Sequence, residues 1–460
     1  MKKPHFLFCL VLLLFFSCDE VEEDSDFYIT GRVVNTSGEG IEGVKIYYSD
    51  SDYVVTDRLG NWAIFEIYNE GLSIAPISAD YVFTPEVHMV NQMDQGIEKI
   101  FMANEVESEE VNQIFNWFTN QQRSNGLLES TENGNIVSLY DSALAAMVFM
   151  LNDDYTKAEN IFDFFNSRID SELLVGLGGF SQLRDKEGNP NNRRWMGDNA
   201  WLLIALNNYS ARTGSTKYNR LATEISKWLI GLQDIDGGLF GGYSPDGTKI
   251  HKITEGNIDA FNAVQGYTAF HEKILDYLKN ERWDSKDRNL VAWVGHPQYL
   301  YALDLHSWSY CIFEDYPIST LYDADRFLNS KTSTTTNLEL VGYGFDEDKD
   351  VIWLEGTGHM ALAYKIGGVD SEADFYLKEM EKVLIKSILY ENAAGFPYAA
   401  NSGTSYGSEM LWEGADINLV ISTGAWYIFA QKGFNPFEVE RKKGIPQDKK
   451  FWLHQEVYLN

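Results

Sequence analysis

The sequence predicts a mainly α-helical protein, an (α/α)6 toroid preceded by a small all-β sandwich domain. Two observations predict this order. After about residue 104, amphipathic segments alternate with segments that are apolar all round, whereas the preceding stretch alternates like short strands between turns. The 460 residues suffice for two or three domains. The expected parts are a lipoprotein signal peptide at 1–17, an acidic tether at 18–26, the sandwich at 27–103, the toroid at 104–435 and a C-terminal tail at 436–460.

The composition argues against several classes of partner and site. Lys and Arg number 37 against 68 Asp and Glu, which gives a net charge of −31. Nucleic acid is therefore disfavoured as a partner, because each phosphate contact needs Lys or Arg. The three cysteines are too few for a disulfide framework or a metal cluster. Twelve Trp, 26 Tyr and 27 Phe supply many flat rings, which pack in cores and also against sugars.

The first 18 residues form a targeting segment. Lys2 and Lys3 precede an apolar stretch, 6–16, that is too short to span a bilayer. The stretch ends at Ser17-Cys18 and resembles a bacterial lipoprotein signal, which implies cleavage before Cys18 and lipidation of its thiol. An ordinary signal peptide with an incidental cysteine is the alternative. No other stretch is apolar enough to span a membrane.

The acidic run after Cys18 reads DEVEEDSD and should be a solvated tether. It resembles the surface-export signal of Bacteroidota lipoproteins. That resemblance implies an anchor in the outer membrane of the cell envelope, with the protein exposed on the outer face. Components of a glycan importer are further candidate partners there.

Residues 27–103 contain short runs of strand-forming residues separated by Gly, Asp and Ser, the pattern of an antiparallel sandwich. Gly31-x-Val33, the Gly43-Val44 strand start and the turn from Thr56 to Trp62 resemble the carboxypeptidase-regulatory-like β-sandwich. Such domains are usually spacers without chemistry. A glycan-binding role is the alternative.

The helical part contains about six pairs of segments, of which the fourth is the least regular. Segments that are apolar all round must be inside, and amphipathic ones can cover them. The outer segments are 110–122, 156–169, 217–233, 285–294, 319–328 and 373–389, and the inner ones are 140–151, 199–209, 258–270, 307–313, 357–366 and 418–430. An open solenoid of helical hairpins is the alternative, but its repeat length would be fixed, and here the spacing varies.

Acidic residues mark the starts of five inner segments: Asp141, Asp198, Glu255 with Asp259, Glu355, and Asp416 with its neighbour Glu413. For each one alone, helix capping is the plain interpretation. Parallel inner helices, however, bring their N-termini to one mouth of a toroid. Aromatic residues accompany the acids, which suits a carbohydrate: Tyr140, Trp195, Trp201, Trp353 and Trp412. Arg194 could orient a carboxylate or a sugar hydroxyl, or form a salt bridge.

Four motifs together resemble the six-hairpin glycosidase-like superfamily over roughly residues 108–432. They read Y-D-x-A-L at 140–144, G-D-N-A-W at 197–201, T-E-x-N-I-D at 254–259 and W-x-E-G-T-x-x-M-A at 353–361. The resemblance is specific for the fold. It is less specific for the activity, because the superfamily includes hydrolases, phosphorylases, lyases and epimerases. The third motif commonly has His after Glu, where this chain has Gly256.

The first hypothesis is a glycoside hydrolase with paired carboxylates acting on a poly- or oligosaccharide, and the superfamily resemblance implies inversion. Glu255 is the expected acid and Asp198 the expected base, with Glu355 the first substitute for either. The predicted substrate-binding residues are Tyr140, Asp141, Arg194, Trp195, Trp201, Asp259, Trp353, His359, Trp412 and Asp416.

Two other functions remain open. A polysaccharide lyase or sugar epimerase would use His359 or His306 as a base, with Arg194 pairing a uronate; the net charge argues mildly against an anionic polymer. A surface glycan-binding protein without catalysis is the third hypothesis. Cys311 lies in an apolar segment, where we expect it to be inert. We expect no cofactor, since no phosphate loop or dinucleotide fingerprint is present. We expect no required metal, since Cys311 and His306 make a poor metal pair; calcium on the acidic loops is the alternative.

Overall fold

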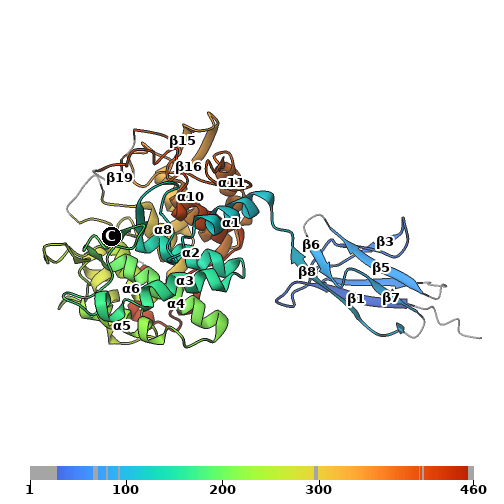
Figure 1. The fold of residues 1–460 in the computed structure, drawn as a ribbon. Coiled ribbons are helices and arrows are strands. Elements are labelled where there is room, and N and C mark those ends of the chain that lie inside the picture. The colour runs from blue at the N-terminus through green and yellow to red at the C-terminus, as the bar shows by residue number, and fades with distance from the viewer. Residues whose placement is uncertain are drawn as a thin grey trace, which may run out of the picture. The chain divides into compact units, whose positions relative to one another are not determined.

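The chain divides into two compact units, residues 1–107 and 108–460 (Figure 1). The computed structural model describes residues 28–65, 71–78, 81–91, 94–294, 299–403, 405–406 and 409–453. The predicted signal peptide, the tether and Cys18 lie outside these residues. Within the described ranges, no helix is long and apolar enough to cross a membrane.

The first unit is a β-sandwich of two four-stranded sheets with a common core. One sheet has the order β4 (Asn61–Phe65), β1 (Tyr28–Val34), β8 (Lys99–Glu105), β6 (Tyr81–Thr84), and the other β3 (Tyr53–Val55), β2 (Lys45–Tyr47), β5 (Leu72–Ile77), β7 (His88–Val90). The pairing is antiparallel except between β1 and β8, which are parallel. The core contains Ile29 and Trp62 from the first sheet and Ile46 and Ile74 from the second.

The sequence motif of this unit has a physical cause. A Cβ on Gly31 would overlap the ring of Trp62, so the missing side chain is what lets this tryptophan cover β1. The Thr56 hydroxyl donates to the carbonyl of Ile41 and accepts from the amide of Val44, which joins two loops. Asp57 accepts from two backbone amides and closes the turn before β4.

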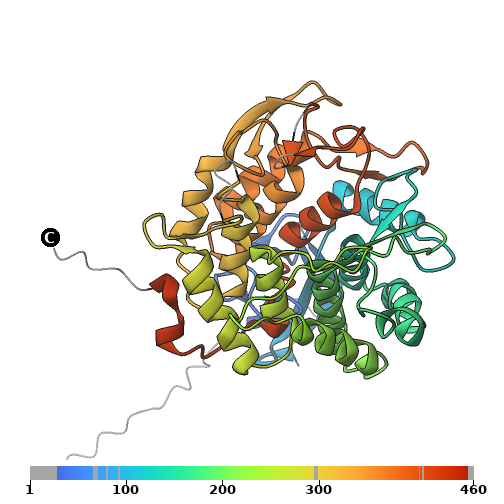
Figure 2. The same ribbon diagram turned by 90° about the vertical axis from the view of Figure 1, so that its left-hand side faces the viewer.

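The second unit is an (α/α)6 toroid (Figures 1 and 2). Its inner helices are α2 (Leu139–Leu151), α4 (Met196–Thr213), α6 (Thr254–Ala263), α8 (Leu303–Ile312), α10 (Leu354–Ile366) and α12 (Ile421–Gln431). Each packs on the next, and α12 packs on α2, which closes the ring. The outer helices are α1 (Glu109–Gln121), α3 (Tyr155–Asn166), α5 (Asn219–Gly231), α7 (Ala269–Tyr277), α9 (Ser319–Asp323) and α11 (Asp370–Glu381).

Burial explains which helices are inside. Nearly all side chains of α2 and α12 are buried, as their apolar sequences require. In α5, by contrast, only one stripe is buried, formed by Leu221, Ile225 and Leu229 at spacings of four residues. The alternation of amphipathic and all-apolar segments thus specifies the two layers.

Long connections precede the inner helices, and short ones follow them. The segments 167–195, 232–253, 324–353 and 382–420 lead into inner helices, whereas turns such as 152–154 lead out. The long connections carry two-residue to five-residue strand pairs: β9 (Ile136–Ser138) with β10 (Leu183–Asp185), β11 (Arg194–Trp195) with β12 (Gly242–Tyr243), β13 (Trp283–Asp284) with β14 (Asn289–Leu290), β15 (Leu328–Thr332) with β16 (Glu339–Tyr343), β17 (Ile385–Lys386) with β18 (Ala394–Gly395), and β19 (Ser405–Tyr406) with β20 (Glu409–Met410). One end of the ring is therefore covered by long loops.

The predicted fourth outer helix at 285–294 was wrong. The structure has the β13–β14 hairpin there, and the outer helix is α7, earlier in the chain. The expected inner segment 258–270 joined the end of α6 to the start of α7. Gly266, with φ +77°, breaks the two apart, and a capping box between Thr268 and His271 starts α7.

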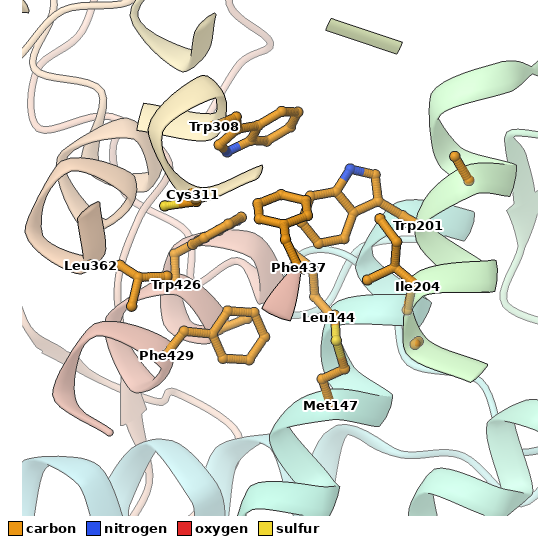
Figure 3. Packing of buried hydrophobic residues seen from close by; sticks show 14 of the residues in the cluster. Leu144, Met147, Trp201, Ile204, Trp308, Cys311, Leu362, Trp426, Phe429 and Phe437 are labelled. Atoms are coloured by element: carbon orange, nitrogen blue, oxygen red, sulfur yellow. The ribbon is translucent and has the colours of Figure 1, made fainter. Parts of the chain in front are cut away.

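Residues 436–453 are not a detached tail but part of the toroid. Phe437 is fully buried and lies among the rings of Trp201, Trp308 and Trp426 (Figure 3). The amide of Asn262 near the end of α6 donates to the Phe437 carbonyl at 2.9 Å. The segment therefore closes the ring at the C-terminal ends of the inner helices.

Truncating Phe437 tests this closure. Phe437→Ala removes a fully buried ring, so we expect the free energy of unfolding of the helical unit to fall by about 3–5 kcal/mol. Urea unfolding followed by near-ultraviolet circular dichroism measures this change. Val439→Ala, at a side chain 41% exposed in the same segment, is the matched control and should change little. Equal stability of both variants would show that Phe437 does not seal the ring.

Candidate active site

The largest concentration of predicted site residues surrounds a cavity of about 250 Å³ at the N-terminal ends of the inner helices. Its polar lining comprises Ser130, Thr131, Tyr140, Asp141, Asp198, Glu255, Asp304, Glu355, His359, Tyr398 and Ser422. Its apolar lining comprises Trp201, Trp308, Trp353, Trp412 and Val420. Segments from all six inner helices thus meet at one place.

Five carboxyl groups enter this cavity, each from the first turn of a different inner helix. They are Asp141 on α2, Asp198 on α4, Glu255 on α6, Asp304 on α8 and Glu355 on α10. The toroid aims the N-termini of its inner helices at the cavity. Each helix therefore presents the end whose partial positive charge favours an anion. The fold therefore gathers the carboxyl groups at the place where the positive ends of the helix dipoles partly offset their negative charge.

Burial sets the protonation of these acids. It raises the pKa of Asp141 to about 8, and those of Asp198 and Asp304 to about 7. Carboxylates in a low-dielectric site that face one another cannot all ionise at neutral pH. The cavity therefore holds protons as well as charge, which is the condition for acid and base catalysis in one site.

Glu255 and Asp198 differ in what surrounds them. For Glu255, burial and the carboxylates of Asp304, Asp198 and Glu355 all raise the pKa well above its usual value. For Asp198, burial is opposed by hydrogen bonds from the backbone amide of Tyr140 and the side chain of Gln182, and by the charge of Arg193. Glu255 is thus the better proton donor and Asp198 the better proton acceptor.

Glu355 belongs to a hydrogen-bonded chain that starts at the floor of the cavity. The indole nitrogen of Trp426 donates to the Tyr140 hydroxyl at 2.7 Å, and that hydroxyl donates to Oε1 of Glu355 at 2.7 Å. Nε2 of His359, one helical turn further along α10, lies 3.6 Å from the same oxygen. Burial lowers the pKa of His359, so this imidazole is neutral at pH 7.

Aromatic rings form the floor and one wall. Trp201 and Trp308 pack at 5.4 Å between ring centroids, and Phe437 seals them from below (Figure 3). Tyr398 and Trp412 pack at 4.6 Å beside the opening, where Trp412 is 47% exposed. Such surfaces suit a ligand with flat apolar faces and polar edges.

Four predicted binding residues do not line the cavity. Arg194 forms an ion pair with Glu172 at 3.8 Å, which is the salt-bridge alternative. Trp195 lies under the guanidinium of Arg193. Asp416 lies in the loop before α12 and borders a separate surface pocket that shares only Trp412 with the cavity.

Asp259, the fourth of these residues, is fully buried one turn after Glu255. Its carboxyl lies against Gly197, where the lack of a Cβ leaves room for it. Burial and the neighbouring acids raise its pKa well above the usual value, so it is protonated at neutral pH. A Cβ on Gly256 would meet the terminal methyl group of Met196, a flexible side chain that can move aside. The histidine common at this position in related motifs would not fit without a shift.

Sequence reasoning missed seven lining residues: Ser130, Thr131, Asp304, Trp308, Tyr398, Val420 and Ser422. Asp304 starts α8 as the other acids start their helices, but the segment was expected to begin at residue 307. The signal was present in Ala-Leu-Asp-Leu at 302–305, and the irregular fourth pair hid it. Tyr398 lies in the long loop 382–420, where no periodicity marks it.

Two other singled-out residues lie away from the cavity. His306 is buried, its Nδ1 lies 3.0 Å from the Thr320 carbonyl, and burial lowers its pKa to about 4. Burial raises the pKa of the Cys311 thiol to about 12. Among the described residues, no group of three or more His, Cys, Asp or Glu side chains is arranged to hold a metal ion.

No family model matches the chain, and no curated protein is similar to it. Solved structures do match. A glycosidase variant superposes with a TM-score of 0.51 at 12% identity, covering 72% of this chain and 99% of that one. A glycosidase variant in complex with glucose gives 0.50, with the same identity and coverage. A sugar epimerase from a ruminal bacterium gives 0.49 at 11% identity, covering 71% and 97%. The predicted fold class is confirmed.

The raised pKa of Asp141 makes the stability of the toroid depend on pH. The group titrates near 3.8 when solvated and near 8 in the fold, so the folded chain keeps a proton that the unfolded chain loses. The free energy of unfolding should therefore fall as pH rises from about 4 to 8. Asp141→Asn removes the ionisable carboxyl group. We therefore expect its Tm to lie several degrees above that of the natural chain at pH 8.5 and to differ little at pH 4.5.

Thermal unfolding of the full chain at both pH values checks this result. Asp374→Asn, on the exposed face of α11, is the matched control and should give no pH-dependent difference. An Asp141→Asn variant that is less stable at pH 8.5 than at pH 4.5, relative to the natural chain, would contradict the assigned protonation.

Proposed function

We propose that the protein is a carbohydrate-active enzyme, and that it is a glycoside hydrolase acting on a poly- or oligosaccharide. One observation carries the proposal: five carboxyl groups from five inner helices meet in a single cavity walled by Trp and Tyr. Sugar C–H faces pack on rings and sugar hydroxyls donate to carboxylates. Solved structures with this fold include glycosidases, one of them in complex with glucose, which supports the same class of substrate here.

The reaction needs one protonated and one ionised carboxyl on either side of the scissile bond. We assign the acid to Glu255, because every neighbour favours its protonated form. Its proton passes to the leaving oxygen as the bond to the anomeric carbon breaks. We assign the base to Asp198, whose hydrogen bonds favour the ionised form. Asp198 takes a proton from water, which attacks the opposite face and inverts the anomeric centre.

The other lining residues hold the sugar. Glu355 already accepts a hydrogen bond from Tyr140 and adds to the charge that keeps Glu255 protonated. Asp141 and Asp304 offer further acceptors and, when protonated, donors for sugar hydroxyls. Trp412 at the exposed rim offers a ring face to a sugar unit that leaves the cavity.

A sugar epimerase is the second candidate, because His359 is a neutral imidazole on the cavity wall. It could take a proton from a carbon next to a carbonyl group. His306 and Arg194 do not reach the cavity and cannot assist. An epimerase would change stereochemistry without releasing new reducing ends, which separates the two candidates.

Removing the proposed acid and base tests the hydrolase. The full chain is incubated with neutral and uronate-containing glycans, and reducing ends, unsaturated uronates and epimers are measured. We expect new reducing ends only, with Glu255→Gln and Asp198→Asn each lowering the rate by about 10²- to 10⁴-fold. Glu187→Gln, on an exposed loop, is the control and should retain full activity.

Other products would redirect the assignment. Unsaturated uronates would establish a lyase, and epimers whose formation is abolished by His359→Gln would establish the second candidate. Binding of a glycan without any turnover would leave a surface glycan-binding protein. Release of reducing ends that survives Glu255→Gln would refute the role of Glu255.

We further propose that Cys18 carries a lipid anchor and that the β-sandwich is a spacer between the membrane and the toroid. The proposal rests on the apolar stretch before Cys18 and the acidic run after it. An outer-membrane, surface-exposed location would place the cavity where large glycans can reach it. Components of a glycan importer would then be the natural partners for its products.

Cys18→Ser tests the anchor. In a bacterial host that processes lipoproteins, we expect incorporation of labelled palmitate to be lost and the protein to leave the membrane fraction. Cys9→Ser, within the apolar stretch, is the matched control and should still be labelled. Labelling that persists in Cys18→Ser would show that the cysteine is incidental.

A further inference from the structure

A groove of about 370 Å³ lies at the segment that leads into α6 and is lined by basic and aromatic side chains. Its lining includes Phe240, His251, Lys252, Arg282 and Trp293. In a chain with a net charge of −31, a surface site built from these residue types differs in character from the rest of the molecule.

The groove adjoins the proposed acid and base through the backbone. Its lining residue Ile253 is the N-cap of α6, two positions before Glu255. Gly241 accepts a hydrogen bond from the amide of Met196, two positions before Asp198, and donates to the carbonyl of His251. The loop that lines the groove therefore leads directly into the helix turns that carry Glu255 and Asp198.

The two basic side chains of the groove, Lys252 and Arg282, differ in their partners. Lys252 is paired with Asp234 and Asp236, at 2.7 and 2.6 Å. Arg282 instead donates to two backbone carbonyls, at 3.2 and 3.3 Å, and within the described ranges it forms no ion pair. Its guanidinium keeps further N–H groups for a ligand.

A second arginine adds positive charge near both the groove and the cavity. Arg193 acts electrostatically on both sides: its charge helps to lower the pKa of His251, after burial and Arg282, and it stabilises the ionised form of Asp198. Among the residues that the structure describes, Arg193 likewise has no acidic partner, and it stacks on Trp195. Arg193 therefore contributes positive charge to both His251 in the groove and the proposed base.

We propose that this groove is a subsite for a sugar bearing a carboxylate or sulfate, so that the natural substrate is an acidic glycan. The inference rests on the proposed function and names its substrate class. Trp293, 47% exposed and packed on His251 at 4.6 Å, presents a ring face for the sugar. The Arg282 fork pairs with the anionic substituent, a geometry that carboxylate and sulfate share.

The net charge of the chain argues mildly against an acidic glycan, but the charge near the bound substituent matters more. Global charge slows the approach of an anion, but the contact energy depends on groups within a few ångströms. In the adjoining cavity, burial raises the pKa of Asp141 to about 8, and burial together with the neighbouring acids raises that of Glu255 well above its usual value, so these two groups stay protonated at neutral pH. The local environment of a bound anion is therefore set by the arginines.

Binding to an array of neutral, uronate-containing and sulfated oligosaccharides tests the subsite. The full chain carries Glu255→Gln, so that bound glycans are not cleaved. We expect the tightest ligands to be acidic and Arg282→Gln to raise their Kd about tenfold, without affecting neutral ligands. Arg282→Lys should restore part of the affinity, and Arg288→Gln, at an exposed arginine outside the groove, should change nothing.

A double-mutant cycle then locates the charge. Methyl esterification or desulfation of the bound glycan should weaken binding to the natural groove about tenfold and to Arg282→Gln far less, because the two changes remove the same contact. If methyl esterification weakens binding, the bound substituent is a carboxylate; if desulfation weakens it, the substituent is a sulfate. Trp293→Ala should weaken charged and uncharged glycans alike.

The results separate this inference from the proposed function. Tightest binding to neutral glycans, or equal losses for neutral and acidic glycans in Arg282→Gln, would overturn the subsite. If Glu255→Gln still abolishes hydrolysis of the same glycan, the hydrolase stands. Absence of binding and cleavage across the whole array would overturn both.

Discussion

The site depends on the exclusion of water from the centre of the ring. Trp201, Trp308 and Trp426 close the floor of the cavity, and Phe437 fills the space beneath them. Were this centre filled with water, solvation would let the carboxylates ionise independently and their pKa values would return to ordinary ones. The hydrophobic packing of the core and the acid–base character of the cavity are therefore one property.

The toroid also explains how so many acids tolerate one another. Each sits in the first turn of an inner helix, so backbone amides compensate part of its charge. Asp304, for example, accepts backbone hydrogen bonds at the start of α8 that lower its pKa against the effect of burial. The remaining repulsion is relieved by protonation. The fold thus fixes both the positions of the acids and the number of protons they share.

Periodicity made most of this predictable. The distinction between apolar and amphipathic segments gave the two helical layers, and the acids at helix starts indicated one convergent mouth. The fourth pair failed because Gly266 and the capping box at Thr268 interrupt the pattern, and with it Asp304 was missed. The positions of Arg194 and Asp259 could not be predicted. The sequence pattern shows that a polar residue lies near a helix start, but it does not show whether its side chain reaches the cavity or is buried behind it. Phe437 was assigned to a tail because its partners Trp201 and Trp308 lie far earlier in the chain, on other helices.

That last contact sets an order of events during synthesis. The floor needs Trp201 from the middle of the chain and Phe437 from near its end, and α12 must reach α2 before the ring is closed. While the ribosome is still adding the final helix, the earlier helices have no complete cavity and no sealed centre. A nascent chain therefore lacks the closed cavity and its sealed floor until the last residues dock.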